Sequence, residues 1–165
     1  MTDSEFREAF HSHKDVLYRF TYRMTGSHDV AEDVVQDTFA ALWKDGCGYD
    51  SGRGALRAYL LGIARNLVLK RWRSRHPDES IEEDRFVSEP IDLARLEMSE
   101  AIAEAVQRLP PLQREALILA EYEEMPLFEM AMATGSELAA VKSRLHRARE
   151  NLRRALRPLL EQTRS

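Results

Sequence analysis

The stretch LFEMAMATGSELAAVKSRLHRAR, residues 127–149 of 165, indicates the fold more clearly than any other part of the sequence. It divides into a short apolar segment (127–133), a turn at Thr134, Gly135 and Ser136, and a longer segment that keeps helical apolar spacing from residue 137 to about residue 157. Glycine readily adopts the left-handed backbone of a tight turn, and two helices joined by such a turn form a helix-turn-helix. We therefore predict this motif in the last third of the sequence.

The longer helix has an apolar face and a polar face. At about 100° per residue, one narrow arc holds the apolar residues Val141, Leu145, Ala148, Leu152 and Leu156. The outward positions nearest the start of the helix, which a recognition helix presents to base edges in the major groove, are Lys142, Ser143, His146 and Arg147. Arg144 is better placed for phosphate contacts, which position a protein on DNA without reading its sequence. The alternative interpretation is a solvent-exposed face of a three-helix bundle.

Helical spacing also dominates the rest of the sequence, and no segment alternates like a strand. Three helices are predicted over residues 5–25, 29–44 and 55–75, with Gly26 ending the first and Ser27 capping the second. A further helix is predicted to begin near Leu93, to break at residues 109–111 and to resume over 112–121. The fold class is therefore all-α, with two small helical domains (1–76 and 93–165) joined by a flexible acidic linker (77–92).

The third helix carries an unusual polar stripe beside its apolar arc. The residues expected to be buried are Leu56, Leu60, Ile63, Ala64 and Leu67. On another face, Tyr59, Asn66, Lys70 and Arg73 lie in line. An aromatic ring, an amide and two cations can stack on a base, bond its edge and hold its backbone, as single-stranded nucleic acid requires. Arg65 and Arg71 lie off this stripe, where they would reach a different strand or stay in solvent. A partly buried Tyr59 and a merely exposed Asn66 would be the alternative.

The second helix presents the opposite charge. Its outward residues include Asp33, Gln36 and Asp37, together with Asp29 and Glu32. Carboxylates on one helix face repel DNA, so this face is either solvated or a docking surface for a protein with basic groups.

The net charge of −4 conceals this distribution. Residues 63–75 hold five bases and no acid, residues 78–100 hold nine acids and two arginines, and residues 142–157 hold seven bases and one acid. Two basic blocks separated by an acidic stretch are consistent with binding a polyanion at two places.

Several classes of protein are disfavoured. No run approaches the ~20 apolar residues of a membrane-spanning helix, and no secretory signal is recognised, so a cytoplasmic protein without membrane insertion is expected. The single Cys47 can form no internal disulfide, and the five histidines show no metal-ligand spacing. No phosphate-binding glycine motif is present. We therefore expect no catalytic residue, no metal and no cofactor, and we do not expect an enzyme.

Four segments resemble a known family when they are taken together. Residues 31–43 (AEDVVQDTFAALW) and 49–66 (YDSGRGALRAYLLGIARN) resemble conserved region two of bacterial RNA polymerase sigma factors. Residues 109–117 (LPPLQREAL) and 141–149 (VKSRLHRAR) resemble region four. Their order and the short linker resemble the extracytoplasmic-function (ECF) subfamily of the sigma-70 family. The helix-turn-helix departs from the usual family pattern at Ala139 and Ala140, and at Lys142 and His146.

The resemblance implies a role for each candidate surface. Asp33, Gln36 and Asp37 would dock on the β′ clamp helices of core RNA polymerase, while region four would meet the β flap. Tyr59, Arg65, Asn66, Lys70 and Arg73 would bind the promoter element at minus ten, with a flipped base at Asn66 and a pocket formed by residues 49–53. Lys142, Ser143, Arg144, His146 and Arg147 would read the minus-thirty-five element. The resemblance also implies control by an anti-sigma factor.

Two other interpretations remain open at the level of sequence. A helix-turn-helix repressor would explain only the C-terminal half of the chain. A sigma-like decoy that binds an anti-sigma protein without activating promoters should lose its basic DNA-facing residues, which this chain keeps.

Overall fold

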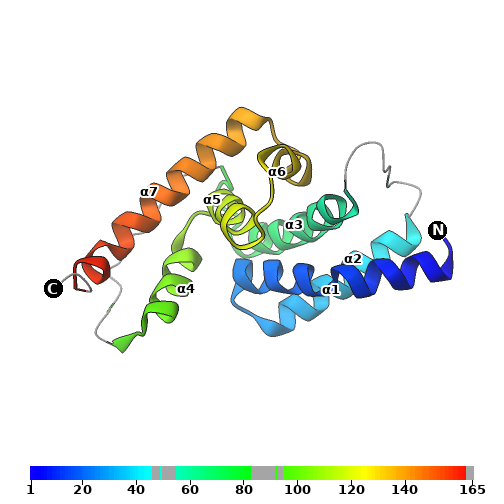
Figure 1. The fold of residues 1–165 in the computed structure, drawn as a ribbon, viewed down its shortest axis with the longest axis horizontal. Helices are drawn as coiled ribbons and strands as arrows, with labels where there is room; N and C mark the ends of the chain where they lie inside the picture. The colour runs from blue at the N-terminus through cyan, green and yellow to red at the C-terminus, as the bar shows by residue number, and fades with distance from the viewer. Residues whose placement is uncertain (46–48, 50–54, 83–91, 93–94, 163–165) are drawn as a thin grey trace.

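All regular secondary structure in the described residues is helical (Figure 1). The computed structural model describes residues 1–45, 49, 55–82, 92 and 95–162. Its elements are α1 (Asp3–Thr25), α2 (His28–Lys44), α3 (Leu56–Arg75), α4 (Met98–Arg108), α5 (Pro111–Leu117), the π-helical turn η4 (Ile118–Tyr122), α6 (Leu127–Thr134) and α7 (Leu138–Gln162). The expected all-α fold class is confirmed. None of the helices in these residues has the length and apolarity needed to cross a membrane.

Helices α1, α2 and α3 form the N-terminal unit. Thr2 starts α1 with a reciprocal capping box, in which its hydroxyl accepts from Glu5 N and the Glu5 carboxylate accepts from Thr2 N. Gly26 ends α1 with a left-handed φ of 71°, and the Ser27 hydroxyl accepts from Val30 N at the start of α2. The predicted boundary between the first two helices is confirmed.

Helices α4 to α7 form the C-terminal unit and contain the predicted helix-turn-helix. Gly135, with a φ of 61°, caps α6, and α7 begins three residues later, at Leu138. The predicted apolar arc of α7 faces the core, with Val141, Leu145, Ala148 and Leu156 buried and Leu152 half-buried. Helix α4 begins at Met98 after the N-cap Glu97. Residues 93 and 94, where this unit was predicted to begin, lie outside the described part.

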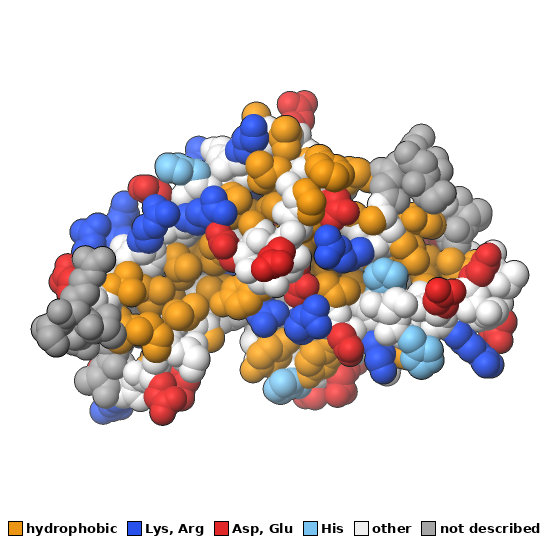
Figure 2. Space-filling view, in the orientation of Figure 1, with side chains coloured by type: hydrophobic (Ala, Val, Ile, Leu, Met, Phe, Trp, Pro, Cys, Tyr) orange, Lys and Arg blue, Asp and Glu red, His pale blue; other side chains and the backbone are white. Residues whose placement is uncertain are grey.

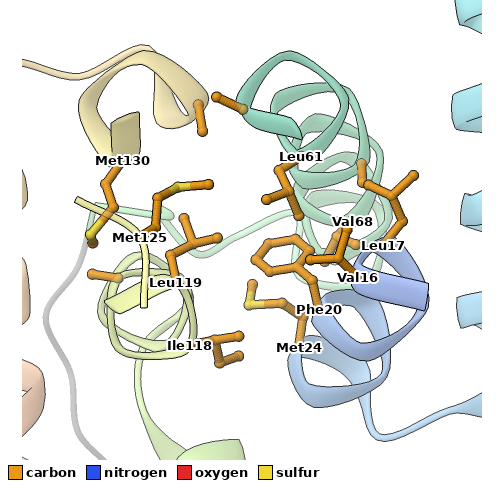
Figure 3. Close-up of a cluster of buried hydrophobic side chains, with 14 of the residues drawn as sticks. Val16, Leu17, Phe20, Met24, Leu61, Val68, Ile118, Leu119, Met125 and Met130 are labelled. Atoms are coloured by element: carbon orange, nitrogen blue, oxygen red, sulfur yellow. The ribbon is translucent and has the colours of Figure 1, made fainter. Parts of the chain in front are cut away.

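The two units pack together and share one hydrophobic core. Leu17, Phe20 and Met24 of α1 and Leu61 and Val68 of α3 belong to the same buried cluster as residues of the C-terminal unit, which include Ile118, Leu119, Met125 and Met130. Figure 3 shows these side chains converging from both units. A second, smaller cluster joins α4 to the end of α7. Residues far apart in the sequence therefore fold into one continuous body.

This shared core corrects the expected buried arc of α3. Leu60 and Ala64 are buried as expected, but the side chains expected beside them are only half-buried: Leu56, Ile63 and Leu67. The other buried residues of α3 are Ala58, Leu61, Val68 and Leu69. The reason is that α3 contacts α1 and α2 in its own unit and α6 in the other. A helix covered from two sides buries more of its circumference than a single amphipathic arc.

Candidate nucleic-acid interface

The start of α7 presents the predicted recognition residues to solvent. Lys142, Ser143, His146 and Arg147 are all exposed, while Val141 and Leu145 hold the opposite face of the helix in the core. Figure 2 shows lysine and arginine side chains gathered along the outer edge of α7. The start of α7 therefore presents exposed polar and basic side chains on one face of the helix.

Arg144 is held differently from its neighbours. Its Nη1 donates to the Ser136 hydroxyl at 2.7 Å, and its side chain is half-buried. Ser136 lies in the turn between α6 and α7, so this hydrogen bond fixes the turn to the first part of the recognition helix. In this arrangement Arg144 stabilises the turn of the helix-turn-helix.

The predicted stripe on α3 is exposed at three of its four positions. Asn66, Lys70 and Arg73 face solvent. Tyr59 is half-buried against the core, with its ring centroid 5.4 Å from that of Tyr49. The amide of Asn66 and the two cations are therefore accessible to a ligand, whereas the ring of Tyr59 is only partly accessible. Residues 50–53 of the predicted pocket, and Cys47, lie outside the described part.

Arg65 does not lie where the sequence placed it. It was expected to reach DNA or to stay in solvent, but its Nε and Nη2 donate to the Glu115 carboxylate of α5 at 2.8 and 3.0 Å. The Glu115 side chain is 1% exposed and that of Arg65 is 16% exposed. Burial raises the pKa of Glu115, and the hydrogen bonds from Arg65 oppose this shift. The partners are 50 positions apart, so no local pattern signals the pair.

The predicted acidic face of α2 is exposed to solvent. Asp33, Gln36 and Asp37 are exposed, because Ala31, Val34 and other residues on the opposite face of α2 pack into the core. Arg71 Nη2 lies 3.9 Å from Asp33 Oδ2, but both side chains are substantially exposed, and such a surface pair contributes little.

The sequence did contain one signal that was missed. Gly62 interrupts an otherwise strong helix, and glycine costs about 1 kcal/mol relative to alanine in a helix interior. Such a glycine often marks a close approach of another backbone. In the structure, a Cβ at position 62 would lie 2.9 Å from the Ala133 carbonyl oxygen of α6.

Within the described residues, no group of three or more histidine, cysteine or acidic side chains could hold a metal ion. The polar groups at the three faces are suited to hydrogen bonding and charge pairing with macromolecules.

Two family models match the chain in the order in which the two units occur. Sigma-70 region 2 matches residues 9–77 and Sigma-70 region 4 matches residues 99–152. Among curated proteins, ECF RNA polymerase sigma factor SigL of Mycobacterium tuberculosis is 31% identical over 162 residues, which cover 93% of this chain and 89% of SigL. SigW of Bacillus subtilis is 28% identical over 169 residues, which cover 93% of this chain and 90% of SigW.

Solved structures of sigma factors also match the fold of this chain. The sigma factor RpoE of Bartonella quintana, in complex with the anti-sigma factor NepR, matches with a TM-score of 0.72 and 27% identity over 93% of this chain and 97% of that one. CnrH, in complex with the cytosolic domain of CnrY, matches with a TM-score of 0.70 and 26% identity over 95% of this chain and 90% of that one. The two units are thus the two conserved domains of a sigma-70 protein. The chain belongs to the ECF family of RNA polymerase sigma factors, as its sequence motifs predicted.

Proposed function

We propose that three faces of this sigma factor divide the work of transcription initiation. Asp33, Gln36 and Asp37 on α2 dock on core RNA polymerase, the exposed stripe on α3 binds the unpaired minus-ten strand, and the start of α7 reads the minus-thirty-five duplex. The observation that carries the proposal is that each face is exposed on a separate helix, with acidic residues on α2 and basic residues on α3 and α7. The protein acts by binding, in the cytoplasm, and supplies no catalytic group.

The chemistry of α3 suits the capture of an opened strand. Extruding a base from a duplex costs a few kcal/mol. Asn66 can hydrogen-bond a base edge, Lys70 and Arg73 can hold the backbone, and stacking on an aromatic ring contributes about 1–3 kcal/mol per base. These gains arise only once the strands separate, so they favour the open promoter over the closed one.

A regulatory protein partner is also proposed. The two solved relatives with matching folds were each captured with such a partner, RpoE with an anti-sigma factor and CnrH with the cytosolic domain of CnrY. By analogy, we infer that an anti-sigma factor binds this chain.

Run-off transcription with core polymerase on a genomic promoter library tests the proposed function. We expect specific transcripts that depend on the added chain. Asn66→Ala should reduce open-complex formation while affinity for core polymerase is retained, and Ser74→Ala, an exposed change on the same helix, should affect neither. Asp33→Lys with Asp37→Lys should instead weaken binding to core polymerase. Duplex binding that represses transcription, with no new transcripts, would identify a repressor.

A further inference from the structure

Arg144 differs in its surroundings from the other polar residues at the start of α7. Its side chain is half-buried, whereas Lys142, Ser143, His146 and Arg147 are exposed. The sequence predicts a phosphate contact for Arg144, but in the structure its guanidinium group is bonded to the protein itself. Its role in recognition therefore needs an explanation other than direct contact with DNA.

A chain of side-chain hydrogen bonds joins Arg144 to the end of α6. Arg144 Nη1 donates to Ser136 Oγ at 2.7 Å, and this hydroxyl donates in turn to Thr134 O at 3.3 Å. The Thr134 hydroxyl donates to Met130 O of α6 at 2.8 Å. A serine hydroxyl can donate one hydrogen bond while it accepts another, so Ser136 serves both neighbours at once. Helix α7 is thereby bonded across the turn to α6.

The hydrophobic core holds the first turn of α7 only weakly. Leu138 is 42% exposed, Ala139 is exposed and Ala140 is half-buried. Burial in the core begins at Val141 and continues at Leu145. The polar link across the turn therefore anchors α7 at the end where its apolar packing is weakest.

The charge of Arg144 also has a use within the protein. Glu115 of α5 is 1% exposed, and its carboxylate accepts two hydrogen bonds from Arg65. Burial raises the pKa of Glu115, and the positive charge of Arg144 is among the influences that lower it. A cation at position 144 thus stabilises a buried carboxylate, and its presence does not require a DNA phosphate.

A recognition helix can read base edges only if its rotation and tilt are fixed. Side chains that bind with specificity must be held within about 0.5 Å and 10–20° of the productive geometry. The four exposed candidates lie directly before Arg144 and within one turn after it. A shift of α7 relative to the turn would therefore displace all of them together.

We propose that Arg144 is a positioning residue for reading the minus-thirty-five element, and that it acts through Ser136. Arg144 contacts no base. It fixes the orientation of α7, and the four exposed side chains make the base contacts. This inference rests on the proposed function of α7. It makes Ser136, a residue of the turn and not of the recognition helix, a determinant of base discrimination.

The experiment measures base discrimination by the holoenzyme formed with core RNA polymerase. A promoter recovered by run-off transcription is remade as a set of duplexes that carry every single base-pair change in the upstream element. A wrong base pair in a specific site typically costs about 5- to 150-fold in affinity. Ser136→Ala removes the acceptor for Arg144 without changing charge or any proposed DNA contact.

We expect Ser136→Ala to reduce the largest of these penalties by about fivefold. Ser136→Thr keeps the hydroxyl and should retain the wild-type penalties. Ser74→Ala, an exposed change on α3, is the matched control and should alter none of them. Partial unfolding would lower affinity for every duplex by the same factor, so it cannot change the ratio between right and wrong base pairs.

The salt dependence of binding separates positioning from phosphate contact. Loss of a phosphate contact would weaken binding to all sequences alike and reduce the slope of log affinity against log salt by about 1. Arg144→Ala should instead reduce discrimination, as Ser136→Ala does, and leave this slope unchanged.

The proposal is overturned if Ser136→Ala discriminates as well as the wild type, or if Arg144→Ala lowers the salt slope while discrimination is retained. A wild-type holoenzyme that shows no preference for any upstream base pair would contradict the proposed function of α7 and, with it, this inference. The two failures are distinguishable, because the first requires a wild type that discriminates.

Discussion

Two glycines end helices in conformations that other residues rarely adopt. Gly26 after α1 has a φ of 71° and Gly135 after α6 has a φ of 61°. A side chain has ordinary room at both positions, since a Cβ at Gly26 would meet Gln107 at 3.6 Å and one at Gly135 would meet nothing within 4 Å. Only the backbone conformation therefore resists substitution.

Gly26→Ala and Gly135→Ala should each lower the free energy of unfolding by about 1 kcal/mol, because left-handed backbone costs an L-residue about 1–2 kcal/mol. Urea denaturation measures both. The two variants are each other's control, and a much larger loss for Gly26→Ala would show that the Gln107 contact matters as well.

Arg114 is the most constrained cation among the described residues. Burial lowers its pKa to about 10, and it remains charged at neutral pH. Its guanidinium donates to three backbone carbonyls, those of Met24, Gln107 and Leu109. These bonds offset the loss of hydration and tie the end of α1 to the start of α5.

Arg114→Met should destabilise the protein by about 3 kcal/mol, because it leaves buried carbonyls without donors, at about 1–3 kcal/mol for each unsatisfied group. Thermal unfolding at neutral pH measures the loss. Arg114→Lys should recover only part of it, since an ammonium group cannot reproduce the planar fork. Arg154→Met, at an exposed position of α7, should be nearly neutral, and an equal loss there would contradict the argument.

At the scale of whole elements, the sequence predicted helices well when only one face is buried. The arc of α7 was placed correctly because Val141, Leu145 and Ala148 pack on one side and the opposite side is solvated. Helix α3 was placed correctly along the chain but not in rotation, since Leu61 and Val68 are buried where a second unit covers them. Helical periodicity reports a single buried face, and it cannot report a second one made by distant residues.

The contact between α3 and α5 should respond to pH through Glu115. Burial raises the pKa of this carboxyl, with Arg65 and Arg144 acting in the opposite direction. In the unfolded chain Glu115 is in water, and its carboxyl has the ordinary pKa of 4.5. The folded protein therefore binds the proton more tightly, and the stability that this group contributes is complete below pH 4.5 and is lost as pH rises through the raised pKa.

We therefore expect the free energy of unfolding, measured by urea denaturation, to fall as pH rises from 4.5 through that range. Glu115→Gln, which cannot titrate, should flatten the decrease. Stability that falls on acidification in the wild type, but not in Glu115→Gln, would reverse the sign and contradict this account.

At the scale of the molecule, the sequence identified the two domains and three candidate faces but not how the domains meet. Arg57 and Glu129 are 72 positions apart, and Arg19 and Glu123 are 104 apart. Each of these residues, taken alone, has the appearance of an ordinary surface charge. Their pairing depends on the placement of two folded units, which no local spacing encodes.

Salt should affect two interactions of α3 differently: its packing against the C-terminal unit and its proposed binding to DNA. The two units are held together chiefly by apolar side chains such as Phe20, Leu61 and Met130, which are 0–1% exposed, and the carboxylates of the ion pairs between them are at most 15% exposed. Salt shortens the Debye length from about 10 Å at 0.1 M to about 3 Å at 1 M, but it does not weaken apolar burial. Binding to DNA instead releases counterions and falls steeply with salt.

We therefore expect the radius of gyration to stay constant between 0.1 and about 1 M NaCl, while affinity for a fluorescein-labelled single-stranded 15-mer of random sequence falls by orders of magnitude. Small-angle X-ray scattering and fluorescence anisotropy across one salt series measure both. Expansion of the wild type at high salt would mean that charge pairs, and not the shared core, hold the two units together.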